Sequence, residues 1–208
     1  MALFKEQVVR DRAAREMRQQ ANIYKSKSRV LQDSYAAFNR FKTYDIFLSH
    51  SSRDAELILG MKGILEDLGY SVYVDWVDDA QLDRSRVNKD TAATLRERMK
   101  TSKSLFYVTT ESSVSSKWMP WECGYFDGFK EKVAIVPIEK YPYSNDYTGQ
   151  EYLDLYPYCL QEKTKSGLSK LWVHKDKSHY TLYDTWVTTP NSDLRWRRLD
   201  SLGNEMIV

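Results

Sequence analysis

The sequence predicts an α/β fold in which a mainly parallel sheet is flanked by helices. From residue 43 onward, short apolar or β-branched runs alternate with amphipathic helical segments, as in proteins built from right-handed βαβ units. The apolar runs are mostly continuous rather than alternately apolar and polar, as expected for parallel strands buried on both faces. A chain of 208 residues suits one such domain with extensions.

Four strands can be placed from residue type. The segment "YDIFLSH" is an apolar run that ends in polar residues, and "YSVYVD" is rich in β-branched and aromatic residues. Two further apolar runs, "SLFYVTT" and "KVAIVPI", follow later in the chain. The predicted strands are 44–50, 70–75, 104–110 and 132–138.

Three helices are expected between these strands, over 53–69, 91–102 and 118–130. The first is amphipathic and ends at Gly69, a typical helix C-cap. The last carries Pro120 near its first turn, where proline is tolerated. The segment "WVDDAQLDRSRVNKD", residues 76–90, is polar and predicts a loop.

The N-terminal segment predicts one long helix over residues 4–41, because it contains no Gly or Pro. Its apolar residues recur at helical spacing at Val9, Ala13, Met17, Ala21 and Tyr24. Residues 1–42 carry a net charge of +6, against +2 for the whole chain. Two interpretations fit: an amphipathic helix packed on the domain, or an arm for oligomerisation or an anionic surface.

The C-terminal part is less regular. The segment "EYLDLYPYCL" fits a short helix or a fifth strand, and "KLWVHKDKSHYTLYD" predicts a hairpin. The expected organisation is an N-terminal helical extension over 1–42, a central domain over 43–160, and a C-terminal extension over 161–208 that packs on it.

Composition excludes several classes of protein. The two cysteines form no CxxC motif, and the three histidines form no metal-ligand pair at helical spacing, so neither a disulfide framework nor a metal site is expected. No apolar run is long enough to span a membrane, and no secretory leader is visible. A cytoplasmic protein is therefore expected. The net charge of +2 gives little reason to expect nucleic-acid binding.

In an open parallel sheet, ligands bind outside the carboxyl ends of the strands. Trp118 and Glu122 follow the third strand and stand four residues apart, so one helical face presents an indole beside a carboxylate. Such a pair can hold a flat cationic ring and the sugar attached to it. The other candidates that follow strands one and two are Ser49, His50, Ser51, Asp75 and Trp76.

Structural roles explain the same residues. Glu122 fits the positive end of any helix, and Trp118 fits a core position. Ser51 and Asp75 fit ordinary caps of the segments that follow them. The sequence contains neither a GxGxxG motif nor a P-loop.

Three segments, "YDIFLSHSSRD", "GYSVYVDW" and "SKWMPWECGYFDG", in this order and spacing resemble the Toll/interleukin-1 receptor (TIR) domain family in its bacterial form. The resemblance covers about residues 43–160 and implies a flavodoxin-like fold. It departs from the family in two places. Met119 stands where the family often has cysteine, and the loop after the second strand has no glycine.

The resemblance implies an enzyme that cleaves NAD⁺ at the nicotinamide–ribose bond, with NAD⁺ as substrate and no further cofactor. Glu122 matches the catalytic glutamate of the family, Trp118 matches its aromatic partner, and Ser49 and His50 match its substrate cleft. The product would be ADP-ribose or a cyclic isomer. The family's members also imply self-association through TIR domains, a role in antiphage defence, and a downstream effector that senses the product.

Two other functions remain open. A TIR adaptor without enzymatic activity would act through contacts with other TIR domains, and Glu122 would then be an ordinary helix-end acid. A nucleic-acid-binding role for the basic N-terminal helix is a more distant alternative, and strong salt dependence would be its mark.

Overall fold

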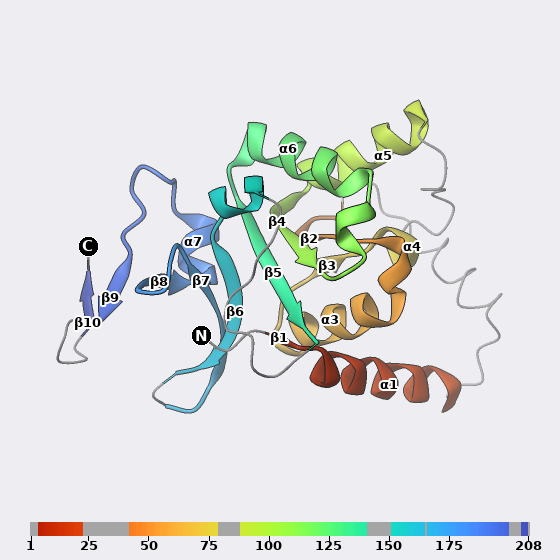
Figure 1. Ribbon diagram of the computed structural model, residues 1–208, viewed down its shortest axis with the longest axis horizontal. Coiled ribbons are helices and arrows are strands. Elements are labelled where there is room, and N and C mark those ends of the chain that lie inside the picture. Colours follow the sequence, from red (N-terminus) through yellow and green to blue (C-terminus); the bar gives the residue numbers. More distant parts are fainter. Residues whose placement is uncertain are drawn as a thin grey trace.

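The computed structural model describes residues 4–22, 42–78, 88–140, 151–164, 166–199 and 205–207. Its centre is a sheet covered by helices on both faces (Figure 1). The predicted α/β class with a mainly parallel core is confirmed. Helices α5 (Lys89–Lys100) and α6 (Trp118–Lys130) cover one face, and α3 (Ala55–Asp67) covers the other together with α1 (Glu6–Asn22).

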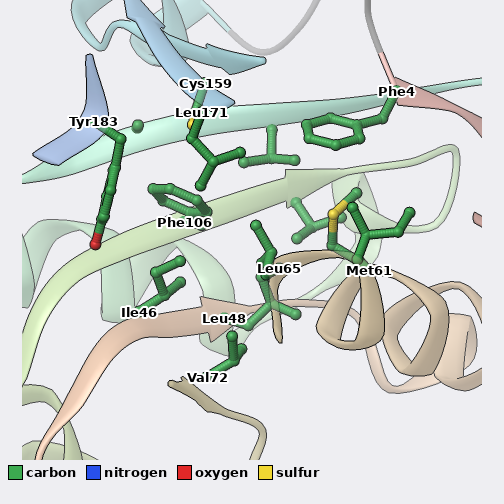
Figure 2. Packing of buried hydrophobic residues seen from close by; sticks show 14 of the residues in the cluster. Phe4, Ile46, Leu48, Met61, Leu65, Val72, Phe106, Cys159, Leu171 and Tyr183 are labelled. Atoms are coloured by element: carbon green, nitrogen blue, oxygen red, sulfur yellow. The ribbon is translucent and has the colours of Figure 1, made fainter. Parts of the chain in front are cut away.

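The parallel core has the order β5-β4-β2-β3. The strands are β2 (Tyr44–Ser49), β3 (Val72–Tyr73), β4 (Ser102–Thr109) and β5 (Val133–Glu139). Successive side chains point to opposite faces, so Ile46 and Leu48 pack toward α3 while Phe47 packs toward α5 and α6. Figure 2 shows the α3 side, where Met61 and Leu65 lie against strand residues. Burial on both faces explains why these strands are continuous apolar runs.

The N-terminal helix was predicted from residue 4, and this start is wrong. Phe4–Lys5 form the short strand β1, which pairs with β5 at Ile138 and Glu139, and the helix begins at Glu6. The neighbouring strand β6 (Tyr158–Lys163) pairs with β5 only at Ile135, so this end of β5 is open to β1. Residues 23–41 of the expected helix lie outside the described part of the chain.

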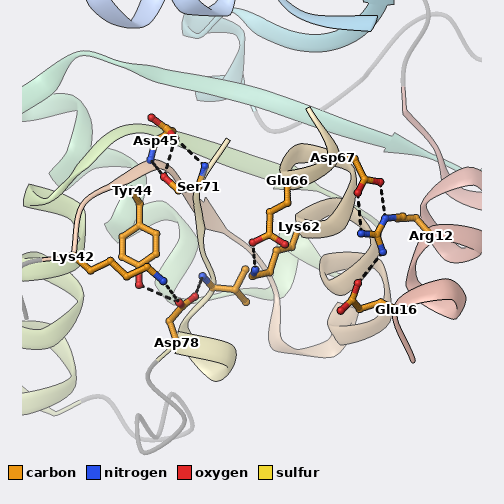
Figure 3. Close-up of polar contacts among 11 residues, drawn as sticks. Arg12, Glu16, Lys42, Tyr44, Asp45, Lys62, Glu66, Asp67, Ser71 and Asp78 are labelled. Carbon is orange, nitrogen blue, oxygen red and sulfur yellow. Dashed lines mark hydrogen bonds and ion pairs between the residues drawn. The ribbon is translucent and has the colours of Figure 1, made fainter. Parts of the chain in front are cut away.

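Helix α1 packs closely on α3. A Cβ atom on Gly60 would lie 2.0 Å from the backbone oxygen of Val9, so only glycine permits this approach. Arg12 binds Asp67 of α3 and Glu16 of its own helix, with Nε–Oδ2 and Nη1–Oε2 distances of 2.7 and 2.9 Å (Figure 3). Within the described residues, α1 is therefore an amphipathic helix that packs on the domain.

Beyond β5 the sheet continues with β6, which pairs parallel to β5 at Ile135. The remaining strands pair antiparallel, and these are β7 (Ser169–His174), β8 (His179–Leu182), β9 (Arg197–Leu199) and β10 (Glu205–Ile207). The predicted hairpin is confirmed as β7–β8, closed by a Lys175 N–H···O His179 bond of 2.9 Å. The segment before it was expected to be a short helix or a strand, and it forms the 3₁₀ helix η3 (Glu151–Leu155) followed by β6. Helix α7 (Tyr183–Thr188) packs on the α3 side of the sheet.

The region after β3 differs from the predicted loop. Asp75–Asp78 form the short helix α4, and residues 79–87 lie outside the described part. Asp78 accepts hydrogen bonds from the Val74 N–H at 2.9 Å and from the Tyr44 hydroxyl at 3.0 Å, and these bonds hold the turn against β2 (Figure 3).

Candidate active site

The site lies where β2 ends beneath the first turns of α6. Helix α6 has the predicted bounds, with Pro120 as its third residue. Its inner face buries Met119, Glu122, Cys123 and Phe126, so Glu122 is the one acid among apolar side chains on that face.

Glu122 is 0% exposed and is held by Ser49, which is also fully buried. The Ser49 hydroxyl donates a hydrogen bond of 2.6 Å to Glu122 Oε2. Hydrogen bonds to an ionised carboxylate are short and roughly twice as strong as neutral ones. The bond therefore fixes the carboxyl group at the carboxyl edge of the sheet, where ligands bind in folds of this kind.

The position of Glu122 along α6 gives the helix-end interpretation little support. Glu122 is the fifth residue of the helix, and no acidic residue lies in its first turn. The field of a helix end falls off within that turn. Burial, by contrast, makes the electrostatic interactions of Glu122 stronger than they would be in water.

Trp118 packs mainly in the core. It is 8% exposed and belongs to the cluster formed by α5, α6 and their face of the sheet. Its ring meets Trp121 edge-on, with centroids 5.4 Å apart. Trp118 therefore occupies a core position in this structure, and its stacking on a substrate stays a prediction.

His50 and Asp75 lie face to face at the ends of β2 and β3, and both are buried. His50 Nδ1 donates to the Leu48 carbonyl at 2.7 Å, and Nε2 lies 3.3 Å from Asp75 Oδ1. Both ring nitrogens face oxygen atoms, although the Nε2 contact lies outside hydrogen-bonding geometry. The pair joins two neighbouring strand ends at the edge that carries Glu122.

Ser51 has the structural role that the sequence left open. Its hydroxyl accepts the Arg53 N–H at 3.4 Å and caps the 3₁₀ helix η1 (Ser52–Asp54). Trp76 lies in α4, and its side chain is outside the description. Asp75 is the first residue of α4 and faces His50, and its capping role stays a prediction.

One contact at this edge was not predicted. Asp54 Oδ2 accepts hydrogen bonds from the hydroxyls of Thr110, at 2.6 Å, and Ser112, and so ties the segment after β2 to the segment after β4. Asp54 follows β2 in the sequence, but no local pattern in "TTESSVSS" predicts its partners.

The described residues contain no group of three or more His, Cys, Asp or Glu side chains that could hold a metal ion. Among the same residues, no helix is long and apolar enough to cross a membrane.

The sequence model of the TIR domain matches residues 46–171, which include both β2 and α6. The chain belongs to the TIR domain family. This TIR domain is 52% identical over 159 residues to the probable 3′ cyclic ADP-D-ribose synthase ThsB′ of Bacillus cereus (strain MSX-D12), a match that covers 76% of this chain and 82% of that protein.

Two more distant proteins are similar. The putative cyclic ADP-D-ribose synthase TIR2 of Cytobacillus dafuensis is 35% identical over 85 residues, which are 40% of this chain and 22% of that protein. The crystal structure of the TIR domain of the Toll-related receptor TRR-2 from Hydra magnipapillata aligns with a TM-score of 0.39 and 18% identity, over 56% of this chain and 82% of that one.

Proposed function

We propose that this TIR domain cleaves NAD⁺ at the nicotinamide–ribose bond and releases nicotinamide with ADP-ribose or a cyclic ADP-ribose isomer. The observation that carries the proposal is the buried Glu122 carboxylate, fixed by Ser49 at the ligand edge of the sheet. The proposal agrees with the name of the 52% identical relative, a probable cyclic ADP-D-ribose synthase.

The chemistry needs one carboxylate. When the glycosidic bond breaks, its electron pair passes to the pyridinium nitrogen, so nicotinamide leaves neutral and needs no general acid. Positive charge then develops on the ribose, and a fixed negative charge in a water-poor site stabilises it with little reorganisation. In O-glycoside hydrolysis, by contrast, a second carboxyl group serves as acid or base.

The second step decides the product. A water molecule that attacks the ribosyl cation loses a proton and gives ADP-ribose. A hydroxyl of the same ADP-ribose that attacks instead loses its proton and closes a ring. The name of the 52% identical relative, a probable 3′ cyclic ADP-D-ribose synthase, favours the cyclic product for this chain as well.

The active form of this domain is an assembly of several copies. Glu122 and Ser49 are fully covered in the single chain, so the site has to open before a dinucleotide reaches them. Contacts between copies can supply the free energy for such a change. The same proposal includes a cytoplasmic location, a role in antiphage defence, and a downstream effector that binds the nucleotide product.

Incubation of the protein with NAD⁺, followed by mass spectrometry, tests the proposed reaction. We expect free nicotinamide together with a product that is lighter than ADP-ribose by one water molecule if the ring closes. Specific activity is expected to rise with protein concentration. An assembled protein that leaves NAD⁺ intact would favour the adaptor function instead.

A further inference from the structure

Buried polar atoms without a hydrogen-bond partner are few in native proteins, and each needs an explanation. Within the part of the chain that the structure describes, some of these atoms belong to β7, at Trp172 and His174. His50 Nε2 and Thr109 Oγ1 are among those at the carboxyl edge of the parallel sheet. Neither atom makes a hydrogen bond within that part of the chain, but His50 Nε2 lies 3.3 Å from the carboxylate oxygen Asp75 Oδ1.

Thr109 is the last residue of β4 and is 2% exposed. Because side chains alternate between the two faces of the sheet along β4, its neighbours show to which face the Thr109 side chain points. Tyr107 packs in the cluster that contains the inner face of α6, and Val108 packs in the cluster that contains α3. Thr109 therefore points to the same face as Tyr107.

This is also the face that carries the Ser49–Glu122 bond. Strand β4 lies beside β2, and Tyr107 is the Cα partner of Ser49. Thr109 is two residues beyond Tyr107, so its hydroxyl lies one side-chain repeat farther toward the edge where ligands bind. The Thr109 and Ser49 hydroxyls thus line the same corner of the sheet.

A valine would fill this position with almost the same volume and shape. The hydroxyl, by contrast, loses its contact with water on burial and gains no protein partner in return, which costs stability. A buried polar group with no partner in the free protein is explained when a ligand supplies the partner.

We propose that Thr109 contacts the substrate and hydrogen-bonds the nicotinamide-ribosyl half of NAD⁺. The inference rests on the proposed function, because Glu122 fixes where the reacting half of the dinucleotide must lie. A threonine hydroxyl both donates and accepts, which matches the nicotinamide carboxamide and the ribose hydroxyls alike. A site with such a partner discriminates against analogues that lack the matching group.

Thr109→Val is the test variant, because it removes the hydroxyl and keeps the shape. We expect KM for NAD⁺ to rise about three- to tenfold, the value of one hydrogen bond. The Tm without substrate is expected to equal or exceed that of the wild type, because the unpaired hydroxyl is gone. Thr109→Ser should restore KM, and Thr181→Val should leave it unchanged, since Thr181 is an equally buried threonine on β8.

Inhibition by nicotinamide distinguishes the two possible partners. Weaker inhibition of Thr109→Val by nicotinamide assigns the contact to the carboxamide, and unchanged inhibition with raised KM assigns it to the ribose. An unchanged KM together with a lowered Tm would overturn the inference, because the hydroxyl would then have a purely structural partner such as a buried water.

Calorimetric titration with NAD⁺ in the Glu122→Gln background gives a readout that does not depend on turnover. Weaker NAD⁺ binding after Thr109→Val supports the contact, whether or not the wild type cleaves NAD⁺. If the wild type binds NAD⁺ but does not cleave it, only the proposed function fails. Cleavage by the wild type with equal Kd and KM in both proteins overturns the contact alone. A wild type that neither binds nor cleaves NAD⁺ overturns both.

Discussion

Ser49 and Glu122 are 73 residues apart in the sequence and are joined by a 2.6 Å hydrogen bond in the interior of the protein. The bond links the last residue of β2 to the buried face of α6. It gives the one acid on that face a fixed position and a donor that stabilises its charged form.

Ser49→Ala removes the donor and leaves the carboxylate buried. A hydrogen bond to a charged group contributes about 1.5–3 kcal/mol, so we expect NAD⁺ turnover to fall by about tenfold or more. Ser104→Ala is the matched control, because Ser104 is equally buried but binds the Tyr183 hydroxyl at 2.9 Å, away from Glu122. If the two variants lose stability and activity in the same proportion, the Ser49 bond has no special role in turnover.

Gly60→Ala should loosen α1 from α3, because the new Cβ would meet the backbone of Val9. Overpacking of this kind costs about 1–3 kcal/mol. Gly124→Ala is the matched control, since a Cβ there meets no atom within 4 Å and alanine favours a helix by about 0.5–1 kcal/mol. Urea unfolding of both variants measures the difference. Equal stability of the two would contradict the close packing of α1.

The fold could be predicted where the pattern is local and continuous. Strands β2, β4 and β5 were found because burial on both faces makes them apolar throughout, and α6 was found to its exact bounds. Strand β1 could not be found, because two residues carry no periodicity and its pairing depends on the open end of β5. The strand-end rule brought Ser49 and Glu122 to one edge, but it could not give their bond.

The remaining features of the site could not be predicted from the sequence for similar reasons. Thr109 ends an apolar run and looks like any other β-branched strand residue until its unpaired hydroxyl is seen. The face-to-face arrangement of His50 and Asp75 depends on the register of two parallel strands. Trp118 taken alone favoured a core position over a substrate platform, and the structure places it in the core.

Asp45 should make the folded state sensitive to acid. Burial alone would raise the pKa of this carboxyl, but Lys103 and Ser71 together hold the pKa below its ordinary value. Ser71 donates from both its N–H and its hydroxyl at 2.8 Å, and Lys103 Nζ lies at 2.7 Å. The contribution is therefore fully present above the ordinary pKa of about 4 and is lost as the pH falls through the lower folded-state value.

The comparison of wild type with Asp45→Asn checks this sign. We expect the difference in the free energy of unfolding to be largest near neutral pH and to shrink as the pH falls below about 4. Chemical unfolding at a series of pH values gives the difference directly. A gap between the two proteins that widens toward low pH would mean that Asp45 is not stabilised in its charged form.

The most direct test of the account is nicotinamide release by the wild type and by Glu122→Gln, measured at a protein concentration where the wild type is active. Glutamine keeps the shape and can still accept the Ser49 hydrogen bond, but it removes the charge. Loss of one electrostatic catalytic group typically costs about a hundredfold or more in rate, and we expect a decrease of that size with the fold retained. Nicotinamide release by a folded Glu122→Gln variant at a rate similar to that of the wild type would contradict the account.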